Sequence, residues 1–408
     1  MTSGHAAAVA RHPDRQMNET QRNGAIPRQA VLGWATFQGR RQAELPSVAD
    51  SPHVVYTTSG RAAIALALRV LDFKAGERVL VPTYHCPTMI SPVVRLGGKP
   101  VFFPVTASGA PAVDYLEHQD LHGVRAMLVA HYFGLAQPMA RVRAFCDARG
   151  IALIEDCAHA FFGTSEGRPI GSWGDLAIAS LTKFFPVPEG GCLVSTTHSL
   201  AGIDLKPRGM VAEMKALIDA LELGARYHRF PGLNALLGAI FGLKELARGR
   251  HWTPADAQDC DPAMAPSVDD ISDALLASRL TRSSRLIAQF AHRSRIVALR
   301  RRNYELLAQL LTDVPGAAPF QALLPASAAP YVFPLRVDHP AERYPALRAA
   351  KVPLFRWDRL WPEMPTIAGD HGPSWAVEMF QLACHQDLSE TELRAVAATV
   401  RRVFSELR

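Results

Sequence analysis

The sequence predicts an α/β protein with a large, doubly wound, mainly parallel sheet and a smaller C-terminal α+β domain. Between Thr57 and Ser195, helix-like segments alternate with short apolar runs, a pattern typical of a parallel sheet covered by helices. Two consecutive apolar runs in this region lead to a charged residue, Asp156 and Lys183. Because parallel strands bring their carboxyl ends to one edge of the sheet, we expect these two side chains to meet there.

The elements of the large sheet follow in order along the chain. Residues 61–72 are rich in strong helix formers and have an apolar face, which predicts a helix. A second helix is expected over 136–149. The expected strands are short apolar runs at residues 78–81, 100–105, 125–130, 151–154 and 176–179.

The second half of the chain has a weaker periodic pattern. Helices are expected over 209–224 and 232–248, and a long helical pattern covers 270–311. Residues 331–337 are expected to form a strand. A capping box at 389–392 is typical of the start of a helix, here the final one.

These patterns divide the chain into three parts. Residues 1–27 are polar and lack the apolar core of a signal peptide, so we expect a disordered tail. The large domain is assigned to 28–268, where a Pro- and Asp-rich linker at 253–268 ends it. Residues 269–408 are assigned to a connecting long helix and a small C-terminal domain.

The segment 232–248 is unusually apolar for a soluble chain. Such a segment is buried in the core, in a subunit interface or against a membrane surface, and the sequence leaves these alternatives open. If a partner subunit covers it, the expected contact residues are Leu236, Leu237, Ile240 and Phe241.

The composition favours a cytoplasmic enzyme. The 408 residues are 48% hydrophobic and 20% charged, which allows a large core. The net charge of +6 comes from scattered basic residues, which argues against a nucleic-acid surface and suits an anionic substrate. The six cysteines form no Cys-x-x-Cys pair, so we expect no zinc site. We expect the protein to work in a reducing compartment. No apolar run is long enough to span a bilayer.

Asp156 and Lys183 together predict a site for pyridoxal phosphate (PLP). PLP chemistry needs a lysine to hold the aldehyde as a Schiff base and an acid to keep the pyridine nitrogen protonated. An isolated aspartate or lysine is most often a solvated surface group. Lys183, however, follows an apolar strand and precedes the Gly190-Gly191 turn. This combination is absent at the other lysines: Lys74, Lys99, Lys206, Lys215, Lys244 and Lys351.

The order of the motifs resembles that of the DegT/StrS family of fold type I PLP-dependent enzymes, over about residues 30–200. Most members are aminotransferases that aminate keto-sugars carried on nucleotides. The resemblance therefore implies this activity, PLP as the cofactor, and a homodimer in which each subunit completes the other's active site. The motifs are Ser59-Gly60-Arg61, Val79 to Tyr84, Glu155-Asp156-Cys157-Ala158-His159, Gly174-Asp175 and Gly190-Gly191.

The resemblance also implies how the cofactor's phosphate is bound. Ser59, Gly60 and Arg61 are expected to bind it at the start of a helix, where backbone N–H groups favour an anion. Family members commonly have Gly-Thr here, so Arg61 replaces the threonine hydroxyl. Ser180, three residues before Lys183, has the spacing of a second phosphate ligand in fold type I enzymes.

The remaining cofactor contacts are expected at His159 and after the strand at 78–81. By resemblance, His159 donates a hydrogen bond to the cofactor's phenolic oxygen. The position of the aromatic residue that stacks on the ring corresponds to Cys86, which is not aromatic. His85 and Tyr84 are the alternatives, and the sequence does not decide between them.

The favoured reaction is transamination from an amino acid donor, glutamate or glutamine by resemblance. Lys183 is expected to move the proton as general acid and base, while Asp156 stabilises the protonated pyridine. The expected acceptor is a nucleotide-linked keto-sugar, and a cyclitol or another non-sugar ketone is the alternative. Related sugar dehydratases have histidine in place of the lysine, so Lys183 argues against a lyase or dehydratase. The presence of both residues argues against a catalytically silent protein.

Overall fold

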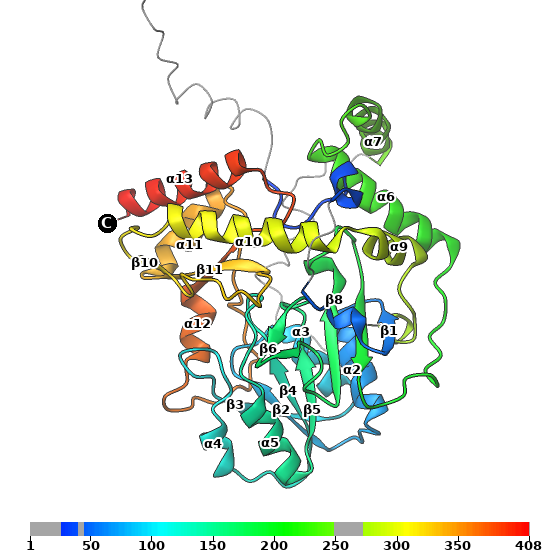
Figure 1. Cartoon of the computed structure of the whole chain (residues 1–408), viewed down its shortest axis with the longest axis vertical. Helices are drawn as coiled ribbons and strands as arrows, with labels where there is room; N and C mark the ends of the chain where they lie inside the picture. Colours follow the sequence, from blue (N-terminus) through cyan, green and yellow to red (C-terminus); the bar gives the residue numbers. More distant parts are fainter. Residues whose placement is uncertain (1–25, 40–44, 249–271, 408) are drawn as a thin grey trace, which may run out of the picture.

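The computed structural model describes residues 26–39, 45–248 and 272–407. Most of the tail expected at 1–27 and all of the linker expected at 253–268 lie outside the described residues. In Figure 1 the large sheet lies below the C-terminal elements, which are drawn in yellow to red, and α7 projects at the top.

The large sheet has seven strands and is mainly parallel, as predicted. Its order is β1-β9-β8-β5-β4-β2-β3, with β9 antiparallel to both of its neighbours. β5 lies between β4 and β8, parallel to both, so the ends of these three strands meet at one edge. The strands are β1 (His53–Thr57), β2 (Arg78–Pro82), β3 (Lys99–Phe103), β4 (Val124–Ala130), β5 (Ala152–Asp156), β8 (Leu176–Ser180) and β9 (Gly191–Ser195).

Helices cover both faces of this sheet because successive strand side chains point to opposite faces. Val79 and Val81 pack with Ile90 of α3 on one face, in a cluster that also includes much of α2. Leu80 packs with Phe145 of α5 on the other face. The helices are α2 (Gly60–Val70), α3 (Pro87–Arg95), α4 (Val113–Glu117) and α5 (Ala140–Arg149), and a small hairpin of β6 (Thr164–Ser165) and β7 (Arg168–Pro169) follows β5.

A second, antiparallel sheet of four strands forms the C-terminal part, in the order β10-β11-β13-β12. Its apolar side chains share one core with the helices α10, α11 and α13. The capping box expected at 389–392 is formed and begins α13. The elements are β10 (Ala317–Pro319), β11 (Val332–Val337), α11 (Pro340–Ala349), β12 (Leu354–Phe355), α12 (Gly372–Glu378), β13 (Met379–Ala383) and α13 (Glu390–Glu406).

The helical pattern expected over 270–311 is interrupted twice, which corrects the expectation of one long helix. Ser278 and Arg279 form backbone bridges to Lys206 and Thr57, which ends the first helix. The N–H of His292 donates to the carbonyl of Thr36 (2.9 Å), outside the helix. Tertiary backbone pairing therefore overrides the local pattern. The helices are α8 (Asp273–Leu276), α9 (Arg282–Phe290) and α10 (Arg293–Leu310).

The helices expected at 209–224 and 232–248 are α6 (Met210–Arg226) and α7 (Asn234–Arg248). α7 has apolar residues on two faces. Leu237 and Phe241 pack against the chain's own core, whereas Leu236 and Ile240 are 58% and 50% exposed. The predicted contact set thus divides into an inner and an outer pair. None of the described helices is both long enough and apolar enough to cross a membrane.

Candidate active site

A cavity of about 230 Å³ lies at the carboxyl ends of β4, β5 and β8. The register places Asp156 of β5 between Ala130 of β4 and Ile178 of β8. Lys183 follows β8 in a short 3-10 turn, η3 (Leu181–Lys183). The predicted site residues that line the cavity are Ser59, Gly60, Arg61, Cys86, Asp156, His159, Ser180 and Lys183. Of the residues considered for the site, His85 and Tyr84 are not in the lining.

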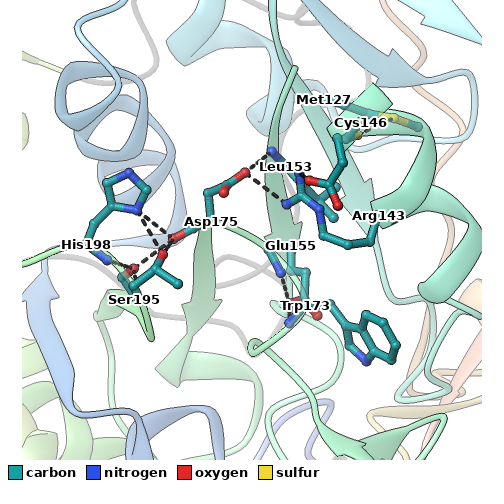
Figure 2. A network of polar contacts seen from close by, with 12 residues as sticks. Met127, Arg143, Cys146, Leu153, Glu155, Trp173, Asp175, Ser195 and His198 are labelled. Carbon is teal, nitrogen blue, oxygen red and sulfur yellow. Dashed lines mark hydrogen bonds and ion pairs between the residues drawn. The ribbon is translucent and has the colours of Figure 1, made fainter. Parts of the chain in front are cut away.

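Polar side chains hold β5 against the segment that leads into β8 (Figure 2). Glu155 accepts hydrogen bonds from the backbone N–H groups of Trp173 and Gly174, at 2.6 and 2.7 Å. The carboxylate of Asp175 accepts from the N–H of Leu153 (2.7 Å) and from Arg143 (3.0 Å). Since Glu155 precedes Asp156 and Asp175 precedes β8, these bonds hold both strands that lead to the site.

Asp156 is buried and Lys183 half-buried, and the loss of contact with water moves both toward their neutral forms. Burial raises the pKa of Asp156, and the charge of Lys183 only partly opposes this shift. Burial likewise lowers the pKa of Lys183, against the attraction of Asp156. The carboxylate of Asp156 accepts a hydrogen bond from the N–H of Ala158 (2.8 Å), which fixes its orientation. A protonated heterocyclic nitrogen in the cavity would give this carboxylate a cationic partner.

His159 is the clearest sign that the cavity receives a polar ligand. Its side chain is buried, and neither ring nitrogen has a hydrogen-bond partner among the described residues. The ring lies between those of Tyr331 and Trp357, with centroids 4.5 and 4.4 Å away. Burial, together with the charge of Lys183, holds the pKa of His159 well below its usual value. A neutral imidazole keeps one N–H to donate, and leaving it unpaired is costly.

The opposite end of the cavity provides donors suited to an anion. Ser59 is the N-cap of α2, its hydroxyl accepting from the N–H of Ala62 (3.2 Å), and Gly60 begins the helix. The hydroxyl of Ser180 lies 3.1 Å from that of Thr182, which also lines the cavity. Helix N-terminal N–H groups and hydroxyls together form a binding site for phosphate.

Gly191 is required by packing against this turn. A Cβ atom at Gly191 would lie 2.4 Å from the carbonyl carbon of Ser59 and 2.6 Å from the nitrogen of Gly60. The start of β9 therefore lies too close to the Ser59-Gly60 turn for a residue with a side chain. Gly190 and Gly191 thus do not line the cavity, but Gly191 packs directly against the Ser59-Gly60 turn that does.

His85 and Tyr84 do not line the cavity, so neither can stack on a ring bound there. Nδ1 of His85 lies 2.9 Å from the carbonyl oxygen of Pro82, and Nε2 accepts from the N–H of Trp361 at 2.9 Å. Tyr84 is buried among aromatic rings. Of the three candidates considered for this role, only Cys86 faces the cavity.

His131, Glu155 and Cys157 form a cluster whose ligand atoms lie within 4.8 Å of one another, close enough for a metal ion. The hydrogen bonds of His131 and Glu155 indicate a structural role instead. Nδ1 of His131 accepts from the N–H of Gln137 (3.0 Å), so Nε2 carries the proton that it donates to Glu155 (3.0 Å). Burial raises the pKa of the Cys157 thiol well above its usual value. His131 and Glu155 therefore form a hydrogen-bonded pair next to Asp156, and His131 also lines the cavity.

Trp357 is a cavity residue that sequence reasoning missed. It lies in the segment after β12, about 170 positions beyond Lys183 in the chain. The Lys183 ammonium is 5.6 Å from the centroid of the Trp357 ring and 5.4 Å from that of Tyr331. The local sequence signal is the run Phe355 to Trp361, dense in aromatic residues and arginine.

The chain was compared with known proteins. A model of the DegT/DnrJ/EryC1/StrS aminotransferase family matches residues 34–239. The chain is 28% identical to GDP-perosamine synthase of Vibrio cholerae over 215 residues, 50% of this chain and 58% of that protein. It is 25% identical to dTDP-4-dehydro-2,3,6-trideoxy-D-glucose 4-aminotransferase of Saccharopolyspora spinosa over 368 residues, 85% of this chain and 83% of that protein. The chain spans about half the length of several curated relatives that it matches.

Solved structures share the fold. The aminotransferase TlmJ of Streptoalloteichus hindustanus superposes with a TM-score of 0.59 at 20% identity, covering 98% of each chain. At this identity the likeness shows the fold alone, namely the large mainly parallel sheet with the smaller antiparallel sheet.

Proposed function

The chain belongs to the DegT/DnrJ/EryC1/StrS aminotransferase family, whose members depend on PLP, and from this premise we propose its reaction. It transfers an amino group from glutamate or glutamine to the carbonyl of a nucleotide-linked keto-sugar, with PLP attached to Lys183. The observation that carries the proposal is the grouping of Asp156, His159 and Lys183 in one cavity beside the N-terminus of α2.

The residues present fit the cofactor group by group. Asp156 would pair with its pyridine nitrogen, and His159 would donate to its phenolic oxygen, which gives a partner to an unpaired buried imidazole. The Ser59-Gly60 turn and Ser180 would bind its phosphate. Arg61 lines the same end of the cavity and would add a positive charge where relatives commonly have threonine.

When bound, PLP supplies an electron-accepting ring that stabilises negative charge on the donor carbon. The chain's own residues then handle the proton. Burial lowers the pKa of Lys183, which favours the neutral amine that a general base requires. Lys183 would take the proton from the donor carbon as general base and would give a proton to the acceptor carbon as general acid. Trp357 lines this part of the cavity and would limit the access of water.

The acceptor is proposed from the relatives and from charge. Two relatives named above are, by their names, a GDP-sugar enzyme and a dTDP-sugar enzyme. The net charge of +6 suits an anionic nucleotide. A cyclitol or another non-sugar ketone is the second candidate, because Arg61 departs from the family pattern at the cavity. Lys183 continues to argue against a dehydratase.

The proposed assembly is a homodimer in a reducing compartment such as the cytoplasm. Leu236 and Ile240 of α7 offer an exposed apolar surface for a second copy. The cysteines of the described residues are unpaired, which suits reducing conditions.

Nitrogen transfer tests the proposal directly. Purified protein with PLP is incubated with ¹⁵N-labelled glutamate or glutamine and with GDP-linked or dTDP-linked keto-sugars, or a cyclitol ketone, and the products are analysed by mass spectrometry. Label on a nucleotide sugar is the expected result, and Lys183→Arg should abolish it. Label on the cyclitol alone would replace the sugar acceptor. No label on any ketone, from protein shown to hold PLP, would contradict the proposed reaction.

A further inference from the structure

Arg300 is a fully buried arginine of α10 whose side chain reaches the backbone of the active-site lysine. Its guanidinium donates to the carbonyl oxygen of Lys183 at 2.8 Å. It also donates to the carbonyls of Pro330 and Tyr331, at 3.1 and 3.0 Å. The fourth bond, from Nε to the side-chain oxygen of Gln386, is 2.8 Å long. One side chain thus connects Lys183 with the segment that carries the ring of Tyr331.

Gln386 extends this connection by one residue. Its amide nitrogen donates to the carbonyl of Phe184 at 2.9 Å, while its oxygen accepts from Arg300. The carbonyls of Lys183 and Phe184, successive along the chain, are therefore both held by side chains from the C-terminal part. The guanidinium also lies over the Phe184 ring, 4.5 Å from its centroid.

The turn that carries Lys183 is short, and the N–H groups of Phe184 and Phe185 both donate to one carbonyl, that of Leu181. η3 is a 3-10 helix of three residues, and its N-cap, Ser180, makes no side-chain capping bond. Such short 3-10 turns have poor hydrogen-bond geometry and depend on their surroundings. A bond from outside the turn to the carbonyl of Lys183 therefore adds to the few bonds that hold this backbone.

The choice of arginine at this buried position also needs an explanation. Among the described residues Arg300 forms no ion pair, and burial lowers its pKa to about 10. Burying an unpaired charge is unfavourable unless its donors are satisfied, and an apolar residue would usually fill such a position at lower cost. An arginine suits this position because its guanidinium can donate to several carbonyl groups at once and so hold them together.

We propose that Arg300 is a positioning residue, which holds the Lys183 turn and the Tyr331 segment together so that the lysine amine keeps its place in the cofactor cavity. Gln386 completes this set of hydrogen bonds, which we call the Arg300 brace. The proposal rests on the proposed function insofar as Lys183 carries PLP, but the brace itself can be measured without cofactor.

The first measurement is hydrogen exchange in the full chain without PLP. In Arg300→Met, the peptide containing residues 181–185 should exchange faster than in the wild type, because its two carbonyl bonds are lost or weakened. Arg301→Met is the matched control. Arg301 is the next residue of α10 and likewise donates to carbonyls, those of Pro325 and Ala328 (2.7 and 2.6 Å), which lie outside the cavity lining. It should leave this peptide unchanged.

The second measurement uses protein loaded with PLP. Arg300→Met should release PLP about tenfold faster, which lowers the activation free energy of release by about 1.4 kcal/mol. It should also lower the visible circular dichroism per bound cofactor. Arg300→Lys, which keeps the charge and one donor direction, should recover part of both. If Arg300→Met does not fold, Arg300→Lys and Gln386→Met decide, with smaller changes in the same direction.

The outcomes separate the two ideas. A lower melting temperature with unchanged exchange at 181–185, unchanged release and unchanged dichroism would make Arg300 merely structural and overturn the inference. A wild type that binds no PLP at Lys183, yet shows the exchange difference, would contradict the proposed function while leaving the brace intact.

Discussion

Burial shifts the pKa values of three titratable cavity residues toward their neutral forms. It lowers the pKa of Lys183 and of His159 and raises that of Asp156. A neutral lysine can act as a base, and a neutral imidazole can donate one hydrogen bond without adding charge. Asp156 becomes stably ionised when a cationic partner enters. The three shifts are therefore consistent with one ligand that has a basic nitrogen and a phenolic oxygen.

The role of Asp156 predicts a large kinetic effect. In Asp156→Ala, loss of the carboxylate should slow the half-reaction with the amino donor by about 10³-fold, because the cofactor nitrogen loses the anion that keeps it protonated. Stopped-flow absorbance of the bound cofactor measures this rate. Asp156→Glu should be less harmful where its longer arm still reaches. Near-normal rates in Asp156→Ala would remove the residue from the mechanism.

His85 predicts a pH dependence of stability. Burial lowers its pKa to about 4 from 6.5, so between these values the unfolded chain binds more protons than the folded chain. The stability that its neutral form provides, about 3 kcal/mol, is complete above pH 6.5 and is lost as the pH falls toward 4. In cofactor-free His85→Gln, the free energy of unfolding measured with urea should depend less steeply on pH between about 4 and 6.5 than in the wild type. The exposed His118→Gln serves as control, and an equal slope in wild type and His85→Gln would contradict the assignment.

At the residue scale, the sequence predicts what local pattern determines. Asp156 and Lys183 could be identified because each stands just after an apolar strand. The orientation of His85 could not, because it depends on a bond to Trp361, 276 positions away. Trp357 was missed for the same reason, since a distant loop brings it to the cavity.

At the element scale, hydrophobic periodicity predicted β2, β3, β4, β5 and β8 of the large sheet, but neither β1 nor β9, nor the course of the chain after residue 270. β2, β4, β5 and β8 have mostly apolar runs. Helices connect β2 to β4 and β4 to β5, which accounts for the parallel pairing of these three strands, whereas only the β6–β7 hairpin lies between β5 and β8. The break between α9 and α10 is invisible in the sequence because it arises from the bond of His292 to Thr36. The periodicity of α7 likewise does not tell which apolar face meets the core.

The two faces of α7 predict opposite effects of charge. Lysine at Leu236 and Ile240, on the exposed face, should weaken self-association without lowering the melting temperature of the monomer. Lysine at Leu237 and Phe241 should lower that temperature, since partly buried apolar side chains are replaced by charge, at about 2 kcal/mol or more. Sedimentation and thermal unfolding distinguish the two. A dimer that survives the outer substitutions would move the interface elsewhere.

At the scale of the whole molecule, the cavity is lined by residues of both the large domain and the C-terminal part. The large sheet provides Asp156 and Lys183, and the C-terminal part provides Trp357, with Arg300 behind the lysine. We propose that the division near residue 268 separates two units that must dock to complete the site. The sequence predicted both units but not their contact, because docking depends on side chains far apart in the chain.

Trp357 tests this shared construction. Trp357→Ala should weaken PLP binding about three- to tenfold, because the aromatic wall beside His159 and Lys183 is lost, whereas Trp357→Phe should keep most of the affinity. Equilibrium dialysis of PLP measures both, with the exposed Trp34→Ala as control. Equal affinity in wild type and Trp357→Ala would place the cofactor away from the C-terminal part.

The most direct test of the central claim is chemical labelling of Lys183. The purified protein is loaded with PLP, reduced with borohydride and digested, and the pyridoxyl group is located by mass spectrometry. We predict that the label lies on the peptide that contains residue 183 and that Lys183→Arg loses it. A stoichiometric label on any other lysine, or none on protein that has taken up PLP, would contradict the account.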